Sequence, residues 1–431
     1  MSNLREARKV LAMRGAFKSV RKRQQDSGDR IRDLEGRKAR LRETRERSVG
    51  NQALLDEAKE RLRENGIKVH LARTRDEAIS LVQREIEGEK LVVKSKSNAT
   101  KEIGLTEALE SAGIEVVETD IGDRIVQLAH EKPSHPTGPA SHLSRHEIAR
   151  VLSAHLGRKV EPDPETIARL VKEEIAGCID RAGVGITGAN ALTAEEGSIV
   201  LQHNEGNILK VMMRPRKHLV IAGIDKIYPD LEEAIIMAKL QAFYATGSVA
   251  SYLHVITGPS KTGDVEKVLV QGVHGPQEVC LILLDNHRSD IAGSEFKELL
   301  YCIGCGECLL VCPAYNVYGK RFAHGVDLGG KGVAYSALSQ GTPDGETKGL
   351  DLCLNCGKCR DACPVSLDVP AMIRKLRTEY QERVLPPRLA AISDFLDSHL
   401  RWLLSAAELE VLGLISRVIR LQAERDASEG P

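Results

Sequence analysis

The stretch that decides the fold of this chain reads Cys302-Ile-Gly-Cys305-Gly-Glu-Cys308-Leu-Leu-Val-Cys312-Pro313. Residues 353–364 repeat it as Cys353-Leu-Asn-Cys356-Gly-Lys-Cys359-Arg-Asp-Ala-Cys363-Pro364, and the two copies hold eight of the ten cysteines. Both have the form C-x-x-C-x-x-C-x-x-x-C-P. Three thiolates at spacing three on a tight loop can bind three irons of one 4Fe-4S cluster, whereas the fourth, next to a proline, ligates the other cluster. The pattern therefore predicts two 4Fe-4S clusters with crossed ligation.

Each predicted ligand set combines three cysteines of one copy with the last cysteine of the other. The first set is Cys302, Cys305, Cys308 and Cys363. The second set is Cys353, Cys356, Cys359 and Cys312. We expect Gly304, Gly306 and Gly357 to let the loops bend closely around a cluster, because glycine accepts backbone angles that other residues resist.

Structural zinc and disulfides explain the cysteines less well. Zinc usually takes two C-x-x-C pairs or mixed Cys/His ligands, which leaves the third cysteine and the proline of each copy unexplained. Disulfides suit small secreted domains, and this chain is long and begins with no signal peptide. Forty residues lie between Cys312 and Cys353, more than in a compact bacterial ferredoxin. This spacing resembles the helical dicluster modules in subunits of succinate dehydrogenase, glycerol-3-phosphate dehydrogenase and heterodisulfide reductase.

Composition excludes several other classes of protein. The chain has 431 residues, room for two or three domains, and its 61 basic residues balance 61 acidic ones. A whole-molecule field for nucleic acid is therefore not expected, and only 3% aromatic residues argue against a base-stacking platform. The sequence contains no uncharged apolar run of about 18 residues. We expect a cytoplasmic protein, with peripheral contact to the inner face of the membrane through a partner as an open alternative.

Four segments are predicted. Residues 1–50 form a basic helical arm, either solvated or docked to an acidic partner. Residues 51–290 form an α/β domain with a mostly parallel sheet, since helices alternate with strands. Predicted strands lie at 67–71, 91–93, 114–118, 182–186, 198–202, 218–222, 252–256 and 278–284. Asp163-Pro164 predicts a helix start, an N-cap followed by proline at the first helical position.

Residues 291–385 form the mainly helical dicluster domain. A helix is expected over Val369–Tyr380, where Arg374, Lys375 and Arg377 form a basic edge that either guides an acidic partner or is simply solvated. Residues 386–431 form an amphipathic helical tail after Pro386-Pro387. Its apolar stripe is expected to pack on its own domain or on a partner subunit.

Polar loops follow several predicted strands of the α/β domain. Open parallel sheets bind ligands at the carboxyl ends of their strands. The residues offered there for a carboxylate or phosphate are Thr187, Asn190, Asn204, Glu205 and Lys261. Neither a Walker loop nor a dinucleotide fingerprint is present, and turns that only reverse the chain remain the alternative. Cys178 and Cys280 are expected in the core, no mononuclear metal site is predicted, and no catalytic residue is assigned.

The same residues carry a resemblance to a known family. Lys94-Ser-Lys-Ser97, the runs 117–129 and 186–207, Gly223-Ile-Asp-Lys226 and the run 256–276 resemble the lactate-utilisation (LUD) domain. With the cysteine motifs behind it, the order over residues 50–385 resembles the iron-sulfur B subunit of the bacterial and archaeal lactate-utilisation system. The resemblance implies a fold related to the ribose-5-phosphate isomerase and CoA-transferase group. It also implies a role, with two partner proteins, in oxidising L-lactate to pyruvate.

Three functions remain open at this stage. In the first, the chain is an electron-transfer subunit whose two clusters relay single electrons for a lactate-oxidising complex. Its partners are a cysteine-rich redox subunit, a second LUD-type protein or a flavoprotein. In the second, the chain binds and oxidises a 2-hydroxy acid itself through the LUD pocket, and Lys261→Ala abolishes turnover. In the third, the relay serves a heterodisulfide-reductase-like complex with another donor.

Overall fold

The computed structural model describes residues 2–384 apart from 29–30, 132, 134–138, 141–142, 325 and 341–348. Contacts divide the chain into two units. The first unit comprises Met1–Gly293 and Ile303–Cys305, and the second comprises Ser294–Cys302 and Gly306–Pro431. The predicted tail of residues 386–431 lies outside the described residues.

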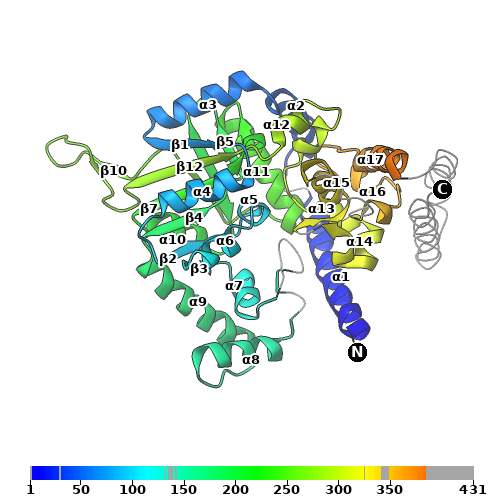
Figure 1. Cartoon of the computed structure of the whole chain (residues 1–431), viewed down its shortest axis with the longest axis horizontal. Coiled ribbons are helices and arrows are strands. Elements are labelled where there is room, and N and C mark those ends of the chain that lie inside the picture. Colours follow the sequence, from blue (N-terminus) through cyan, green and yellow to red (C-terminus); the bar gives the residue numbers. More distant parts are fainter. Residues whose placement is uncertain are drawn as a thin grey trace, which may run out of the picture. The chain divides into compact units, whose positions relative to one another are not determined.

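A six-stranded sheet lies at the centre of the first unit, with the order β1-β12-β7-β4-β2-β3 (Figure 1). Its strands are β1 (Ile67–Ala72), β2 (Leu91–Lys94), β3 (Glu115–Glu118), β4 (Val184–Thr187), β7 (Lys217–Gly223) and β12 (Glu278–Leu284). All five neighbouring pairs run parallel. The α/β class with a parallel sheet is therefore confirmed.

Alternate residues of these strands face two hydrophobic layers. Leu219, Ile221 and Ile282 pack in a cluster with α4 (Arg75–Glu85) and α6 (Leu105–Ser111). Val220 and Leu281 face the opposite way, where α3 (Gln52–Glu64) and α10 (Asn207–Met213) contribute. Farther along the same face, α7 (Ile121–Leu128), α8 (Arg145–Leu156) and α9 (Pro164–Arg181) cover β2 and β3. Strands buried on both faces explain the continuous apolar runs in the sequence.

Two of the predicted strands belong to a different sheet. The order of this second sheet is β8 (Ile227–Tyr228), β5 (Ala191–Thr193), β6 (Ser198–His203) and β9 (Tyr252–Ile256). β6 pairs antiparallel with both β5 and β9. The segments 198–202 and 252–256 are strands as predicted, but they lie outside the parallel sheet. Only residues 194–197 join β5 to β6, too few for a parallel crossover, so the chain forms a hairpin.

The start of α9 is as the sequence predicts. The Asp163 side chain accepts a hydrogen bond from the amide N–H of Thr166 at 2.9 Å, and Pro164 stands in the first turn. This backbone hydrogen bond lowers the pKa of Asp163. The helix then buries Ile167, Leu170 and four further residues along one face. A local signal was sufficient here because a helix cap involves only neighbouring residues.

The basic N-terminal segment is helical and contacts the rest of the first unit. It forms α1 (Ser2–Ser27) and α2 (Leu34–Ser48), and both contact α11 (Leu231–Thr246). Arg45 is fully buried, 3.9 Å from a carboxylate oxygen of Asp225 and 5.0 Å from the ring centre of Tyr228. Arg40 Nε donates to Glu233 at 2.8 Å. The arm packs through arginines that meet buried acids, an interaction that counting apolar residues overlooks.

The second unit is mainly helical, as predicted. Its helices are α13 (Glu307–Val311), α14 (Pro313–Tyr318), α15 (Gly329–Gln340), α16 (Lys358–Asp361) and α17 (Val369–Val384). One short antiparallel pair, β13 (Ala323–His324) with β14 (Asp327–Leu328), precedes α15. A helix able to cross a bilayer is not found in the part of the chain that the structure describes.

One buried carboxylate makes the first unit sensitive to acid. Glu85 lies 2.5 Å from Lys68 Nζ, 3.2 Å from Lys217 Nζ and 3.0 Å from His70 Nε2. Burial by itself raises the pKa of Glu85, but these three partners outweigh burial and lower it to about 2. The ionised carboxylate therefore stabilises the fold above the ordinary pKa of glutamate, and this contribution disappears as the pH falls through about 2.

We predict that Glu85→Gln lowers the free energy of unfolding at pH 7 by about 2 kcal/mol, because the ion pairs with two lysines are lost. The difference from the unsubstituted chain should shrink as the pH falls from 4.5 toward 2. Urea denaturation followed by circular dichroism measures it. Glu87→Gln is the control, since Glu87 is exposed on the following turn. A Glu85→Gln deficit that stays constant with pH would contradict the assignment.

Candidate metal centre

The two cysteine loops share one backbone conformation. Gly306 and Gly357 have φ values of 80° and 76°, and each precedes a short helix, α13 or α16. Gly304 has a φ of 73°, and its counterpart in the second copy, Asn355, has a φ of 52°. Asparagine tolerates this left-handed region better than most residues. The prediction that glycines allow the loops to bend is confirmed, and the sequence repeat is a structural repeat.

The second predicted ligand set meets around one cavity. Cys312 lines it together with Cys353, Cys356 and Cys359, and Cys308 completes the sulfur lining. The other lining residues are Pro313, Phe322, Gly330, Lys331, Leu354, Val369 and Pro370. Tyr315 donates its amide N–H to the Cys312 sulfur at 3.4 Å. Two segments separated by forty residues thus bring their thiols to one place, with a hydrogen-bond donor behind one of them.

The ionisation of these thiols requires positive charge. Burial, helped by the neighbouring Cys353 and Cys356, raises the pKa of Cys312 to about 12. Burial raises the pKa of Cys359 above its usual range, and the thiols of Cys353, Cys312 and Cys356 contribute to the rise. Thiolates are the metal-binding form, and a coordinating cation deprotonates them outright. The donor set fits a cationic iron cluster, which supplies the missing charge.

The sulfur atoms lie too far apart for one zinc ion. Tetrahedral zinc with Zn–S bonds of about 2.3 Å holds its sulfurs about 3.8 Å apart. No three described cysteines have sulfurs all within 4.8 Å of one another. Within the described ranges, a group of three residues of different types does have ligand atoms within that distance of one another: His70, Glu85 and Cys280. Its carboxylate is already paired with Lys68 and Lys217, and burial raises the pKa of Cys280 to about 12, so we assign no metal there.

The cysteines of the first predicted set differ in burial. Cys305 is buried, and Cys302, Cys308 and Cys363 are half-buried. Burial raises the pKa of Cys363, the amide of Leu367 opposes that rise, and the Cys302 thiol raises it further. Cys363 of the second copy therefore lies near Cys302 of the first. The ligand assignment as a whole stays a prediction.

The three basic residues predicted to form an edge on α17 differ in exposure. Arg374 and Lys375 are exposed, but Arg377 is only 5% exposed. Its guanidinium donates to the carbonyl oxygen of Leu350 through Nε at 2.8 Å and to that of Cys353 through Nη2 at 2.6 Å. Arg377 is thus a buried support of the second cysteine loop, not part of a docking edge. Its helical phase with buried Ile373 and Tyr380 was the sequence signal for this position.

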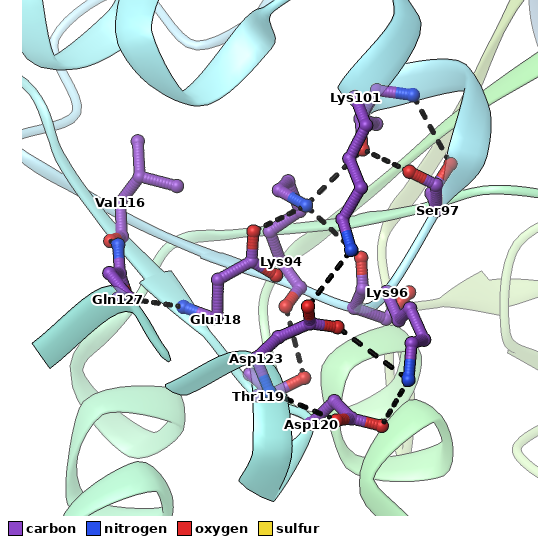
Figure 2. A network of polar contacts seen from close by, with 12 residues as sticks. Lys94, Lys96, Ser97, Lys101, Val116, Glu118, Thr119, Asp120, Asp123 and Gln127 are labelled. Atoms are coloured by element: carbon purple, nitrogen blue, oxygen red, sulfur yellow. Dashed lines mark hydrogen bonds and ion pairs between the residues drawn. The ribbon is translucent and has the colours of Figure 1, made fainter. Parts of the chain in front are cut away.

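A network of lysines and carboxylates lies at the carboxyl ends of β2 and β3 (Figure 2). The Nζ atoms of Lys94, Lys96 and Lys101 point toward Glu118, Asp120 and Asp123, at 2.7, 3.4 and 2.9 Å respectively. Lys94 is 1% exposed, and burial raises the pKa of its partner Glu118. Lys94-Ser-Lys-Ser97 carries part of the family resemblance, but this network was not predictable from it, because the acidic partners come from β3 and the start of α7.

Two residues of the predicted LUD pocket are engaged within the fold. Thr187 is buried, and its Oγ1 lies 2.8 Å from Nε2 of His218. Burial lowers the pKa of His218 to about 3, so that this histidine stays neutral. Asn190 Nδ2 donates to Gln241 Oε1 at 2.7 Å.

The other three pocket residues have separate surroundings. Asn204 accepts from the Ser251 amide at 2.9 Å. Burial raises the pKa of Glu205, as does the nearby carboxylate of Asp120, which places Glu205 at the lysine-carboxylate network. Lys261 is exposed on the β10–β11 hairpin (Lys261–Thr262 and Val270–Gln271). As a single pocket, the five residues remain a prediction.

Comparisons with known proteins agree with this division of the chain. Residues 55–284 match the model of the LUD domain, and residues 298–367 match that of the 4Fe-4S dicluster domain. An uncharacterized electron transport protein, YkgF, from Escherichia coli K12 is 36% identical over 337 residues, which are 77% of this chain and 68% of that protein. Lactate utilization protein B from Geobacillus sp. WCH70 is 34% identical over 377 residues, 86% of this chain and 78% of the relative.

A solved structure was also found. It is a DUF162 family protein from Deinococcus radiodurans, with 15% identity, a TM-score of 0.29 and coverage of 54% of this chain and 96% of that one. The matches to the two family models and to lactate utilization protein B confirm the resemblance drawn from the sequence and the presence of two 4Fe-4S clusters. The chain belongs to the LUD-domain family that includes lactate utilization protein B, and it carries a 4Fe-4S dicluster domain.

Proposed function

We propose that this chain is the iron-sulfur subunit of a multi-protein oxidoreductase that oxidises L-lactate to pyruvate. An electron-transfer role in lactate utilisation follows from the dicluster domain and the named relatives. The observation that carries the proposal is the cavity where Cys312 meets Cys353, Cys356 and Cys359. Ligands from both motifs at one site make the two clusters neighbours, which is what a single-electron relay requires.

The two-electron chemistry belongs to a partner. Oxidation of lactate removes two electrons and two protons, whereas an iron-sulfur cluster passes electrons singly. The sequence carries no flavin or nicotinamide fingerprint. We therefore assign the substrate-oxidising step to a cysteine-rich redox subunit, a second LUD-type protein or a flavoprotein, and place the complex in the cytoplasm, with any membrane contact made by a partner.

In this role the side chains would hold the clusters, shield them from water and adjust their reduction potentials. The cysteines bind the irons, and apolar neighbours such as Phe322 and Leu354 restrict water at the second site. The Tyr315 amide donates toward the Cys312 sulfur, an interaction that stabilises added negative charge on a ligated cluster. The LUD unit, with its neutralised lysines, serves as a scaffold.

Crossed ligation predicts which cluster each cysteine supports. Cys312→Ser should damage the cluster built mainly by Cys353, Cys356 and Cys359, and Cys363→Ser should damage the other. Mössbauer and electron paramagnetic resonance (EPR) spectra of the anaerobically purified variants distinguish the two losses. Cys178→Ser is the control, because Cys178 is buried in α9 of the first unit. Loss of the mutated motif's own cluster in either variant would refute the crossed assignment.

Purification from the native host tests the complex itself. Anaerobic isolation should give about eight irons and eight labile sulfides per chain. Mass spectrometry should identify a cysteine-rich redox protein and a second LUD-type protein in the same fraction. Eight irons with a disulfide-reducing partner would keep the relay and overturn the substrate. Oxidation of L-lactate by the isolated chain with an artificial acceptor would overturn the relay and make this chain the catalytic subunit.

A further inference from the structure

We infer that the second ligand set, Cys353, Cys356, Cys359 and Cys312, holds the cluster of higher reduction potential, and that Arg377 is the positioning residue that makes it so. This inference rests on the proposed relay and adds its direction. It concerns the residues around the two cysteine motifs, which differ in charge although the motifs themselves are alike.

Arg377 brings a permanent positive charge to the second loop. It is 5% exposed and donates hydrogen bonds to the carbonyl oxygens of Leu350 and Cys353. The Cys353 carbonyl belongs to one of the predicted ligands, so the guanidinium is bonded to the backbone of the second cysteine loop. Arginine stays protonated at every accessible pH. A buried charge is screened far less than an exposed one.

Lys331 places a second cation at the same cavity. It lines the cavity formed by Cys312, Cys353, Cys356 and Cys359, which Cys308 of the first set also borders, and its Nζ lies 4.4 Å from the ring centre of Tyr335. Contact with the aromatic face holds the ammonium in place. Both cations come from helices of the second unit, Lys331 from α15 and Arg377 from α17.

The first motif carries the opposite sign. Glu307 stands between Cys305 and Cys308 and is 5% exposed, whereas the equivalent residue of the second motif is Lys358, which is exposed. A carboxyl group in the first loop works against additional negative charge there. The repeat is thus symmetric in its ligands and asymmetric in its charges.

This asymmetry sets the direction of the relay. Reduction adds one negative charge to a cluster, and nearby cations stabilise the reduced form more than the oxidised form. With both cysteine sets loaded, a single electron would pass from the site of the first set to that of the second, with no bond made and no proton moved. The reductant would be the partner that oxidises the 2-hydroxy acid, and the acceptor a one-electron carrier.

The test is a redox titration of the full chain, loaded anaerobically with both clusters and followed by EPR. Arg377→Gln should lower the higher of the two midpoint potentials by about 59 mV, a tenfold change in the one-electron equilibrium. The lower potential should not change. Arg374→Gln is the matched control, because it removes the same charge from an exposed position on the same helix and should leave both potentials unchanged.

Two further variants separate charge from folding. Arg377→Lys keeps the charge and should restore most of the potential. Lys331→Gln should lower the same potential. If Arg377→Gln fails to retain both clusters, Lys331→Gln becomes the test of whether a nearby cation raises that potential. A fall in the lower potential, or no change in either variant with both clusters present, overturns the inference. Fewer than two clusters in the unsubstituted chain would instead refute the proposed function.

Discussion

Two thiols of the second ligand set, those of Cys312 and Cys359, resist ionisation, and this is the constraint on which the second unit depends. Burial and mutual repulsion raise the pKa of Cys312 to about 12 and that of Cys359 above its usual range. Such a cavity is costly unless positive charge fills it, so the fold of this unit and its iron content are linked. Helices α15 and α17 pack against each other, and Arg377 joins the second cysteine loop to α17. Folding and cluster binding therefore depend on the same contacts.

The LUD unit handles buried charge differently, by pairing side chains. Arg288 bonds both carboxylate oxygens of Glu102, at 3.0 and 2.7 Å, and donates through Nε to Asp225 at 2.7 Å. Burial alone would raise the pKa of Asp225, but Lys226, Arg288 and Arg45 together hold it far below its usual range. Buried pairs of this kind add little net stability, yet removing one member is costly. They fix the loops after β7 and β12, and Arg45 ties the basic N-terminal segment to the same point.

Particular residues show where sequence reasoning reached its limit. The cap at Asp163 and the left-handed glycines of the cysteine loops were predictable, because both depend on neighbours along the chain. The partners of Lys94 and of Arg45 were not, since Glu118 comes from β3 and Asp225 from the short 3-10 helix after β7. The same reason explains the strands at 198–202 and 252–256. Periodicity identified them as strands but could not show that they pair with each other outside the main sheet.

The sequence by itself determined the chemistry of this protein. Two C-x-x-C-x-x-C-x-x-x-C-P motifs specify the cofactor because iron ligation requires thiolates at short, fixed spacings. Alternating helices and strands likewise specified the α/β class, because each element must bury one face. Only the tertiary structure decided which charges surround each motif. Glu307 and Lys358 occupy equivalent positions in the sequence, but the buried cation at the second loop is Arg377, which α17 carries back to Cys353. The electrostatic influence of a charge depends on its distance from the site and on its burial, and the order of residues along the chain gives neither.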